Sequence, residues 1–166
     1  LLSDELHGLA VRKVRPLVGG AAFYGSPETV LRVCLWSRLA GRVNVVVGRV
    51  DASDADALYA GVRNLAWEEV LAERASIAVR ANGVNGELRN TQFTALKVKD
   101  AVCDRLAEAR GARPDVDAQA PDALIEVRLR DDRATIALDL SGASLARRSY
   151  LRSEDGPDAP VAVAQA

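Results

Sequence analysis

Several hydrogen-bonding side chains stand together at the start of a predicted helix in the middle of the sequence. The four are Arg89, Asn90, Thr91 and Gln92. A helix start has backbone N–H groups without intrahelical partners, and the helix dipole favours negative charge there. This combination suits a phosphate group, and Lys97 and Lys99 follow within two turns. An ordinary capped amphipathic helix explains the same residues, so both interpretations stay open.

The predicted helix has clear signals at both ends. Asn90 or Thr91 can act as its N-cap, and Gly111 can end it as a C′ glycine. Apolar residues recur between them at helical spacing, at Phe93, Leu96, Val98, Val102 and Leu106. The loop before it, residues 82–86, is rich in Asn and Gly, but it lacks the Gly-Lys-Ser/Thr of a P-loop.

A second basic cluster lies near the end of the sequence, where Arg147 and Arg148 precede Tyr150. Arginine binds phosphate through two parallel hydrogen bonds, and tyrosine can stack on an unpaired base. We expect a hairpin over residues 124–140 to return the chain toward the sheet end from which the central helix departs. That return would bring both basic clusters onto one surface. Alternatively, the two arginines only pair with nearby acids such as Asp139.

The first part of the chain predicts the element order helix, strand, strand, helix, strand. The residues concerned are 1–9, 11–16, 21–24, 27–41 and 42–50. Ser26 and Pro27 begin the second helix, and a strand is expected before residue 1, so the chain is expected to begin within the first helix. With that strand restored, the order is ferredoxin-like. The second helix is expected to bury Trp36 and the aliphatic series Val30, Leu31, Cys34, Leu35 and Leu39.

The second part predicts an α/β arrangement. Helices are expected from about residue 58, with Ser53 as N-cap, and over 67–71, followed by a strand at 76–81. Apolar and polar residues then alternate on both sides of Asp131 and Asp132, which indicates a hairpin with one buried face and one wet face. Arg128 and Arg130 on the wet face are expected to be solubilising charge.

Composition excludes several classes of protein. The 166 residues have a formal net charge of −1 with one His and two Cys, too few for a metal centre or a nucleophilic triad. Cys34 and Cys103 are expected to be reduced, buried thiols. No apolar run is long enough for a membrane span. Residues 74–152 carry 14 basic and 11 acidic side chains, so any grip on nucleic acid must come from local clusters.

The central helix, together with other blocks in the same order, resembles the THUMP domain, an RNA-binding module. Within that family the chain is most similar to bacterial 23S rRNA guanine-N2-methyltransferases. The blocks that carry the resemblance are residues 34–40, 56–62, 89–93, 95–101, 113–117, 138–142 and 145–150. The last block departs from the family's Leu-His-Arg-Arg-Gly-Tyr-Arg pattern at Ala146, Ser149 and Leu151.

The resemblance implies a mixed α+β and α/β fold, with a ferredoxin-like N-terminal subdomain, lacking its first strand, packed on an α/β THUMP domain. We expect the subdomain over residues 1–52 and the THUMP core over 53–152, although a THUMP profile could start as early as about residue 29. Residues 153–166 are rich in Pro, Ala and Asp, and we expect a linker toward a catalytic domain outside this sequence.

The resemblance also implies RNA as the partner, 23S rRNA foremost, with contacts from Arg89, Asn90, Thr91, Gln92, Lys97, Lys99, Arg147, Arg148 and Tyr150. S-adenosylmethionine is expected in the parent protein and no cofactor in these residues, which lack both the glycine-rich turn and the Asn/Asp-Pro-Pro-aromatic motif of such enzymes. We therefore expect no catalysis by this chain alone, a cytoplasmic location, no membrane contact, and a C-terminal methyltransferase domain as partner. A THUMP module of a tRNA-modifying enzyme and a protein-interaction domain without RNA contact are the alternatives.

Overall fold

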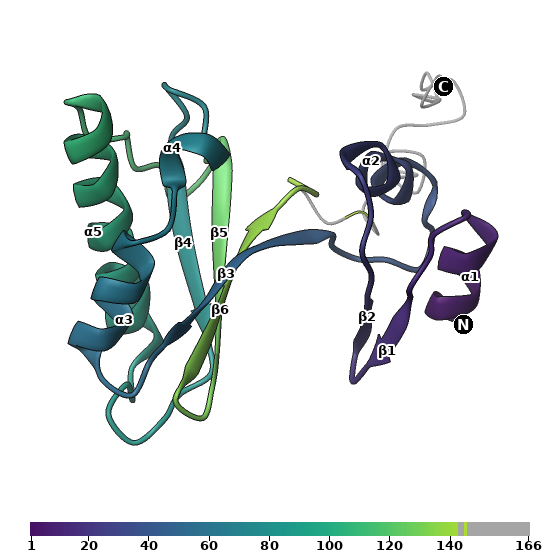
Figure 1. Ribbon diagram of the computed structural model, residues 1–166, viewed down its shortest axis with the longest axis horizontal. Coiled ribbons are helices and arrows are strands. Elements are labelled where there is room, and N and C mark those ends of the chain that lie inside the picture. Colours follow the sequence, from purple (N-terminus) through teal and green to yellow (C-terminus); the bar gives the residue numbers. More distant parts are fainter. Residues whose placement is uncertain (143–144, 146–166) are drawn as a thin grey trace, which may run out of the picture. The chain divides into compact units, whose positions relative to one another are not determined.

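The computed structural model describes residues 1–142 and residue 145. The chain divides into two compact units, one built on Leu1–Val43 together with residues after Leu140, and one formed by Asn44–Leu140 (Figure 1). We call the first the N-terminal unit and the second the sheet unit. Among the described residues, no helix is both long and apolar enough to cross a bilayer.

The N-terminal unit consists of two helices and a short hairpin. Its elements are α1 (Leu2–Gly8), β1 (Arg15–Leu17), β2 (Gly20–Ala22) and α2 (Pro27–Trp36). The strands pair antiparallel and turn at Gly19, whose φ of 77° belongs to the left-handed region that glycine adopts readily. Its buried core consists of Leu6, Val11, Val33, Ala40 and Val43. The predicted helix–strand–strand–helix order is confirmed, with shorter strands.

Helix α2 begins as predicted, and Val30 and Cys34 pack against the core as predicted, but the fully buried residue of the helix is Val33. Ser26 is its N-cap, and the Ser26 hydroxyl oxygen accepts a hydrogen bond from the Thr29 amide (3.4 Å). The expectation that the other large apolar residues of the predicted helix are also buried is wrong. Four of them are more than half exposed: Leu31, Leu35, Trp36 and Leu39. The helix packs against the core through Val30, Val33 and Cys34, which are spaced i, i+3 and i+4. The apolar residues on its other side therefore remain on the surface.

The end of α2 at Trp36, earlier than predicted, has a local cause. The Ser37 hydroxyl donates to Glu5 Oε2 (2.5 Å), and the Arg38 amide donates to Glu5 Oε1 (2.8 Å). Burial of Glu5 opposes its ionisation, but the hydrogen bonds from Ser37 and the following amides outweigh it and lower the Glu5 pKa. A carboxylate on α1 thus binds the chain as it leaves α2, and the helix does not continue to Gly41.

The sheet unit places its helices on one face of a four-stranded sheet (Figure 1). Its elements are β3 (Asn44–Asp51), α3 (Ala55–Arg63), α4 (Trp67–Val70), β4 (Ile77–Asn82), α5 (Thr91–Arg110), β5 (Ala123–Arg130) and β6 (Arg133–Asp139). The strand order is β3-β6-β5-β4, with β4 and β5 parallel and the other pairs antiparallel. This mixed fold agrees with the predicted fold class.

Two local predictions in this unit need correction. The strand expected at 42–50 was assigned to the ferredoxin-like part, but β3 pairs with β6 in the sheet unit, so the two compact units divide between Val43 and Asn44. The N-cap of α3 is Asp54 instead of Ser53, because Asp54 Oδ1 accepts hydrogen bonds from the amides of Asp56 (2.9 Å) and Ala57 (2.7 Å).

The core of the sheet unit lies between the sheet and helices α3, α4 and α5. Helix α5 buries one face consisting of Thr94, Val98, Ala101, Val102, Cys103 and Leu106. Phe93 and Leu96, which were expected on that face, are 44% and 54% exposed. Neither cysteine forms a disulfide, Cys103 is buried and Cys34 is half-buried. Desolvation raises the pKa of the Cys103 thiol.

Candidate nucleic-acid interface

The side chain of Asn90 caps the start of α5. Asn90 is the N-cap, and its Oδ1 accepts hydrogen bonds from the amides of Gln92 (2.8 Å) and Phe93 (3.1 Å). At the other end, Gly111 adopts a φ of 76° as the left-handed C-cap. The predicted boundaries are therefore confirmed. Because Asn90 already satisfies two of the free amides, an anion at this helix start would depend on side chains more than the sequence suggested.

The remaining side chains at the helix start face solvent to different degrees. Arg89 and Gln92 are exposed and Thr91 is half-buried. Arg89 Nε donates to the Gly86 carbonyl oxygen (2.6 Å), so the loop before the helix holds this side chain. A guanidinium has five N–H donors, and one such bond leaves others for a ligand.

Lys97 and Lys99 do not converge. Two residues on a helix are about 200° apart around its axis, so these two side chains leave opposite sides of α5. Lys97 Nζ lies 3.8 Å from Asp56 of α3 and 6.0 Å from the centre of the Phe93 ring. Lys99 Nζ lies 3.1 Å from Asp100. Both lysines that were predicted to contact a phosphate therefore have an acidic neighbour within the unit.

The second predicted cluster, Arg147, Arg148 and Tyr150, lies outside the described residues. The expectation that the hairpin returns the chain toward the start of α5 is wrong. Strand β5 runs to the end of the sheet where α5 begins, and β6 runs away from that end. Asp139 pairs with Leu124, which in turn pairs with Ala78 near the start of β4, whereas α5 follows the end of β4.

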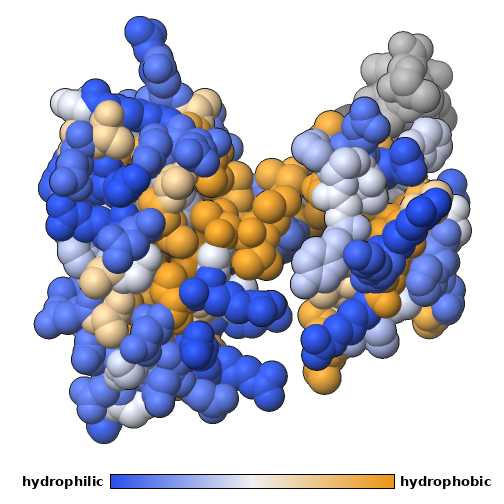
Figure 2. Space-filling view, in the orientation of Figure 1, coloured by the Kyte–Doolittle hydropathy of each residue, from blue (hydrophilic) through white to orange (hydrophobic). Residues whose placement is uncertain are grey.

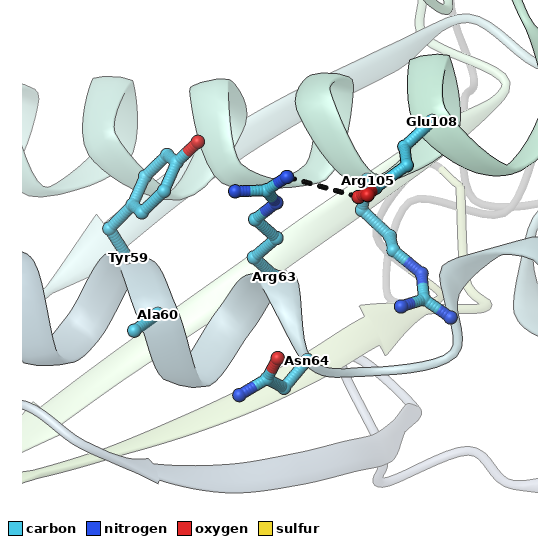
Figure 3. A pocket seen from close by; sticks show the side chains of 6 residues that line it. All are labelled: Tyr59, Ala60, Arg63, Asn64, Arg105 and Glu108. Atoms are coloured by element: carbon cyan, nitrogen blue, oxygen red, sulfur yellow. Dashed lines mark hydrogen bonds and ion pairs between the residues drawn. The ribbon is translucent and has the colours of Figure 1, made fainter.

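A hollow of about 360 Å³ between α3 and α5 offers no free charge to a ligand (Figure 3). It is lined by Tyr59, Ala60, Arg63, Asn64, Arg105 and Glu108. Arg63 Nη2 lies 3.0 Å from Glu108 Oε2, and the Tyr59 hydroxyl donates to Asp104 (2.6 Å). Arg105 binds Glu68 through Nε (3.0 Å) and Nη2. These contacts hold α3, α4 and α5 together.

Sequence reasoning placed Arg128 and Arg130 on the wet face of the hairpin, and both are exposed. It missed that Arg49 lies on the same face of the sheet, on the other side of Thr135 from Arg128, because this depends on the strand order. The only available signal was the alternation within each strand, which gives the face of a residue and not its neighbours.

Comparison with known families covers both units. Residues 1–44 match the RlmL ferredoxin-like domain, and residues 52–139 match the THUMP domain. The second match spans more than half of the chain, and it includes β4, α5 and the β5–β6 hairpin.

Relatives with similar sequences share the name ribosomal RNA large subunit methyltransferase K/L. The protein from Syntrophotalea carbinolica is 44% identical over 150 residues, and that from Dichelobacter nodosus is 50% identical over 150 residues. Each alignment covers 90% of this chain and 21% of the relative. The chain thus spans about a fifth of the length of these relatives.

Solved structures show the same fold. A predicted N6-adenine-specific DNA methylase from Listeria monocytogenes superposes with a TM-score of 0.81 at 28% identity, over 93% of this chain and 40% of that one. The SMU.472 protein, solved in complex with SAH, gives 0.80 at 29% identity, over 89% and 40%. The chain therefore belongs to the THUMP-domain family, and it carries an RlmL ferredoxin-like domain before its THUMP domain.

Proposed function

We propose that this chain is the RNA-recognition part of a ribosomal RNA methyltransferase. The observation that carries the proposal is the succession of the RlmL ferredoxin-like and THUMP domains, in a chain of which 90% aligns with ribosomal RNA large subunit methyltransferases. The resemblance of the central helix to guanine-N2-methyltransferases adds the finer proposal that the substrate is 23S rRNA and the target is a guanine amino group. The chemistry would then belong to a methyltransferase domain in the same protein.

S-adenosylmethionine would supply the methyl group in that domain, and the residues described here do not fit it. The β4–α5 junction has glycines, but a Cβ at Gly83 would lie 2.1 Å from the Leu129 carbonyl oxygen. Packing against β5 therefore accounts for this glycine. Asn90 occupies two amides at the start of α5. We assign no reaction step to this chain, and propose that its residues bind and orient RNA.

For the RNA contacts we propose Arg89, Asn90, Thr91, Gln92, Lys97, Lys99, Arg147, Arg148 and Tyr150. Arg89 and Gln92 are exposed at the start of α5. We propose that Asn90 and Thr91 act mainly by shaping the helix start, since the Asn90 side chain caps the helix. Lys97 and Lys99 must exchange their acidic neighbours for phosphate, so their contributions should be smaller than those of unpaired cations.

A comparison of RNA classes tests this proposal. The affinity of the 166-residue chain for unmodified 23S rRNA, for tRNA and for duplex DNA is measured at one salt concentration. We expect 23S rRNA to bind most tightly. Tighter binding of tRNA would favour a tRNA-modifying enzyme, and no binding of any of the three by the folded chain would favour a protein-interaction domain.

A further inference from the structure

Exposed arginines gather on the face of the four-stranded sheet that α3 and α5 leave uncovered. Side chains alternate between the two faces of a strand. Val50, Val127, Leu129 and Ala134 are buried under the helices. The exposed residues next to them in sequence, which lie on the opposite face, are Arg49, Asp51, Arg128, Arg130 and Arg133. Four of these five residues are arginines. We call these four the arginine face.

The strand register places them in two adjacent rows. Arg49 of β3 pairs with Thr135 of β6, which pairs with Arg128 of β5. In the next row, Arg133 of β6 pairs with Arg130 of β5 on one side and with Asp51 of β3 on the other. Neighbouring strands are about 4.8 Å apart, so the Cα atoms of Arg49 and Arg128 are separated by roughly 10 Å. Residues far apart in sequence thus form one compact cationic surface.

Most of this charge is unpaired within the unit. Among the described residues, Arg49, Arg128 and Arg130 make no ion pair or side-chain hydrogen bond. Arg133 has an acidic neighbour, Asp51. The hydrogen bond from the Ser53 amide is the main cause that lowers the Asp51 pKa, and the positive charge of Arg133 lowers it to a lesser degree. On the side of Arg128 away from Arg130, the next row contains Arg80 and Glu126, and there the two side chains form an ion pair at 3.5 Å. The arginine face therefore has more free cationic donors than α5, where Lys97 and Lys99 both lie beside acids.

The chemistry of the face selects the kind of ligand. The described strand residues on this side include no aromatic ring, so they offer no platform for base stacking by Phe, Tyr or Trp. Guanidinium groups match phosphate oxygens through paired hydrogen bonds. Figure 2 shows strongly hydrophilic side chains projecting from the sheet unit below an apolar patch.

We propose that the arginine face is a further RNA-contact surface, which holds the phosphate backbone. The proposal rests on the function proposed above, and it names a surface distinct from the start of α5. The charge complementarity between unpaired guanidinium groups and phosphates favours RNA. An acidic protein segment is the competing ligand, and the polyglutamate arm of the test addresses it.

The test compares two double variants of the 166-residue chain that remove equal charge. Arg49→Gln/Arg128→Gln alters the arginine face. Arg63→Gln/Arg74→Gln is the control, because Arg63 lies on α3, on the covered side of the sheet, and Arg74 lies in the connection between α4 and β4. Affinity for unmodified 23S rRNA is measured over a salt series, with polyglutamate as a second ligand and thermal melts to verify folding.

We expect the arginine-face variant to bind RNA roughly tenfold more weakly and to flatten the slope of log affinity against log salt by about 1.4–1.8, as expected when two phosphates are no longer neutralised. The control should keep the parent slope. A folded variant with the parent's affinity and slope would overturn this surface but leave the proposed function intact. A parent that binds no RNA would overturn both. If the parent bound polyglutamate as tightly as RNA, and the arginine-face variant lost affinity for both ligands to the same extent, the assignment of this surface to RNA would be overturned.

Discussion

At the scale of single residues, Asn90 has a structural task that can be separated from RNA binding. Its side chain caps α5, so Asn90→Ala should lower the free energy of unfolding by about 1 kcal/mol, within a range of about 0.5–2. Gln92→Ala is the control, because this exposed side chain only follows the cap, and we expect a change below about 0.5 kcal/mol. Urea denaturation measures both. Equal stabilities would show that the cap contributes nothing.

Gly83 and Gly86 flank the same loop but differ in what they permit. Gly83 has a φ of 91°, and an added Cβ would lie 2.1 Å from the Leu129 carbonyl oxygen, whereas a Cβ at Gly86 would meet nothing within 4 Å. Gly83→Ala should therefore destabilise the chain by about 2–3 kcal/mol, and Gly86→Ala by less than about 0.5 kcal/mol. Thermal or urea unfolding checks the pair. A Gly83→Ala variant as stable as Gly86→Ala would contradict the close approach of this loop to β5.

At the scale of elements, the short helix α4 is bound to α5 by a carboxylate–guanidinium pair. The hydrogen bonds from Arg105 lower the pKa of Glu68 to about 2. Because the folded-state pKa is below the unfolded value of about 4.3, the pair stabilises the fold above about pH 4.3, and its contribution is lost as pH falls toward 2.

Glu68→Gln tests this pair. The difference in unfolding free energy between parent and variant should be largest near neutral pH and should disappear as pH falls from about 4.3 to 2. Glu69→Gln removes the same charge from α4 without breaking an ion pair found among the described residues, and should unfold like the parent at neutral pH. A difference for Glu68→Gln that stays constant across the pH range would contradict the role of its ionised form.

The elements also show which parts of the fold the sequence could predict. Helix α5 was predictable because its boundary signals, Asn90 and Gly111, act within one turn of the helix ends. The partner of β3 was not, because β6 lies far along the chain and alternation within a strand does not identify the sheet it joins. The exposure of Trp36 was missed because α2 carries apolar residues on more than one side, and periodicity alone cannot choose between them.

The candidate interface was also predictable only in its local features, and not where it depends on contacts between distant parts of the chain. The cap and the polar start of α5 are local features, and both were visible in the sequence. The arginine face was not, because Arg49 and Arg128 become neighbours only through the insertion of β6 between their strands. The pairing of Lys97 with Asp56 likewise depends on the contact of α5 with α3.

At the scale of the whole molecule, the two clusters first identified in the sequence should differ in weight. Arg147→Ala/Arg148→Ala should weaken RNA binding and flatten its salt slope by about one unit for each phosphate that is no longer bound. Lys97→Ala/Lys99→Ala should have a smaller effect, because both lysines lie beside acids. Affinities over a salt series measure both. If neither folded double variant differs from the parent, these residues do not contact RNA.

If this chain recognises ribosomal RNA through its phosphates, its affinity must fall as the salt concentration rises. The dissociation constant of the 166-residue chain for unmodified 23S rRNA is measured between roughly 50 and 200 mM salt. For three to four phosphate contacts, the released counterions predict a loss of affinity of roughly 20- to 150-fold across this range. An affinity that stays constant over the series, or no binding by the folded chain, would contradict the claim.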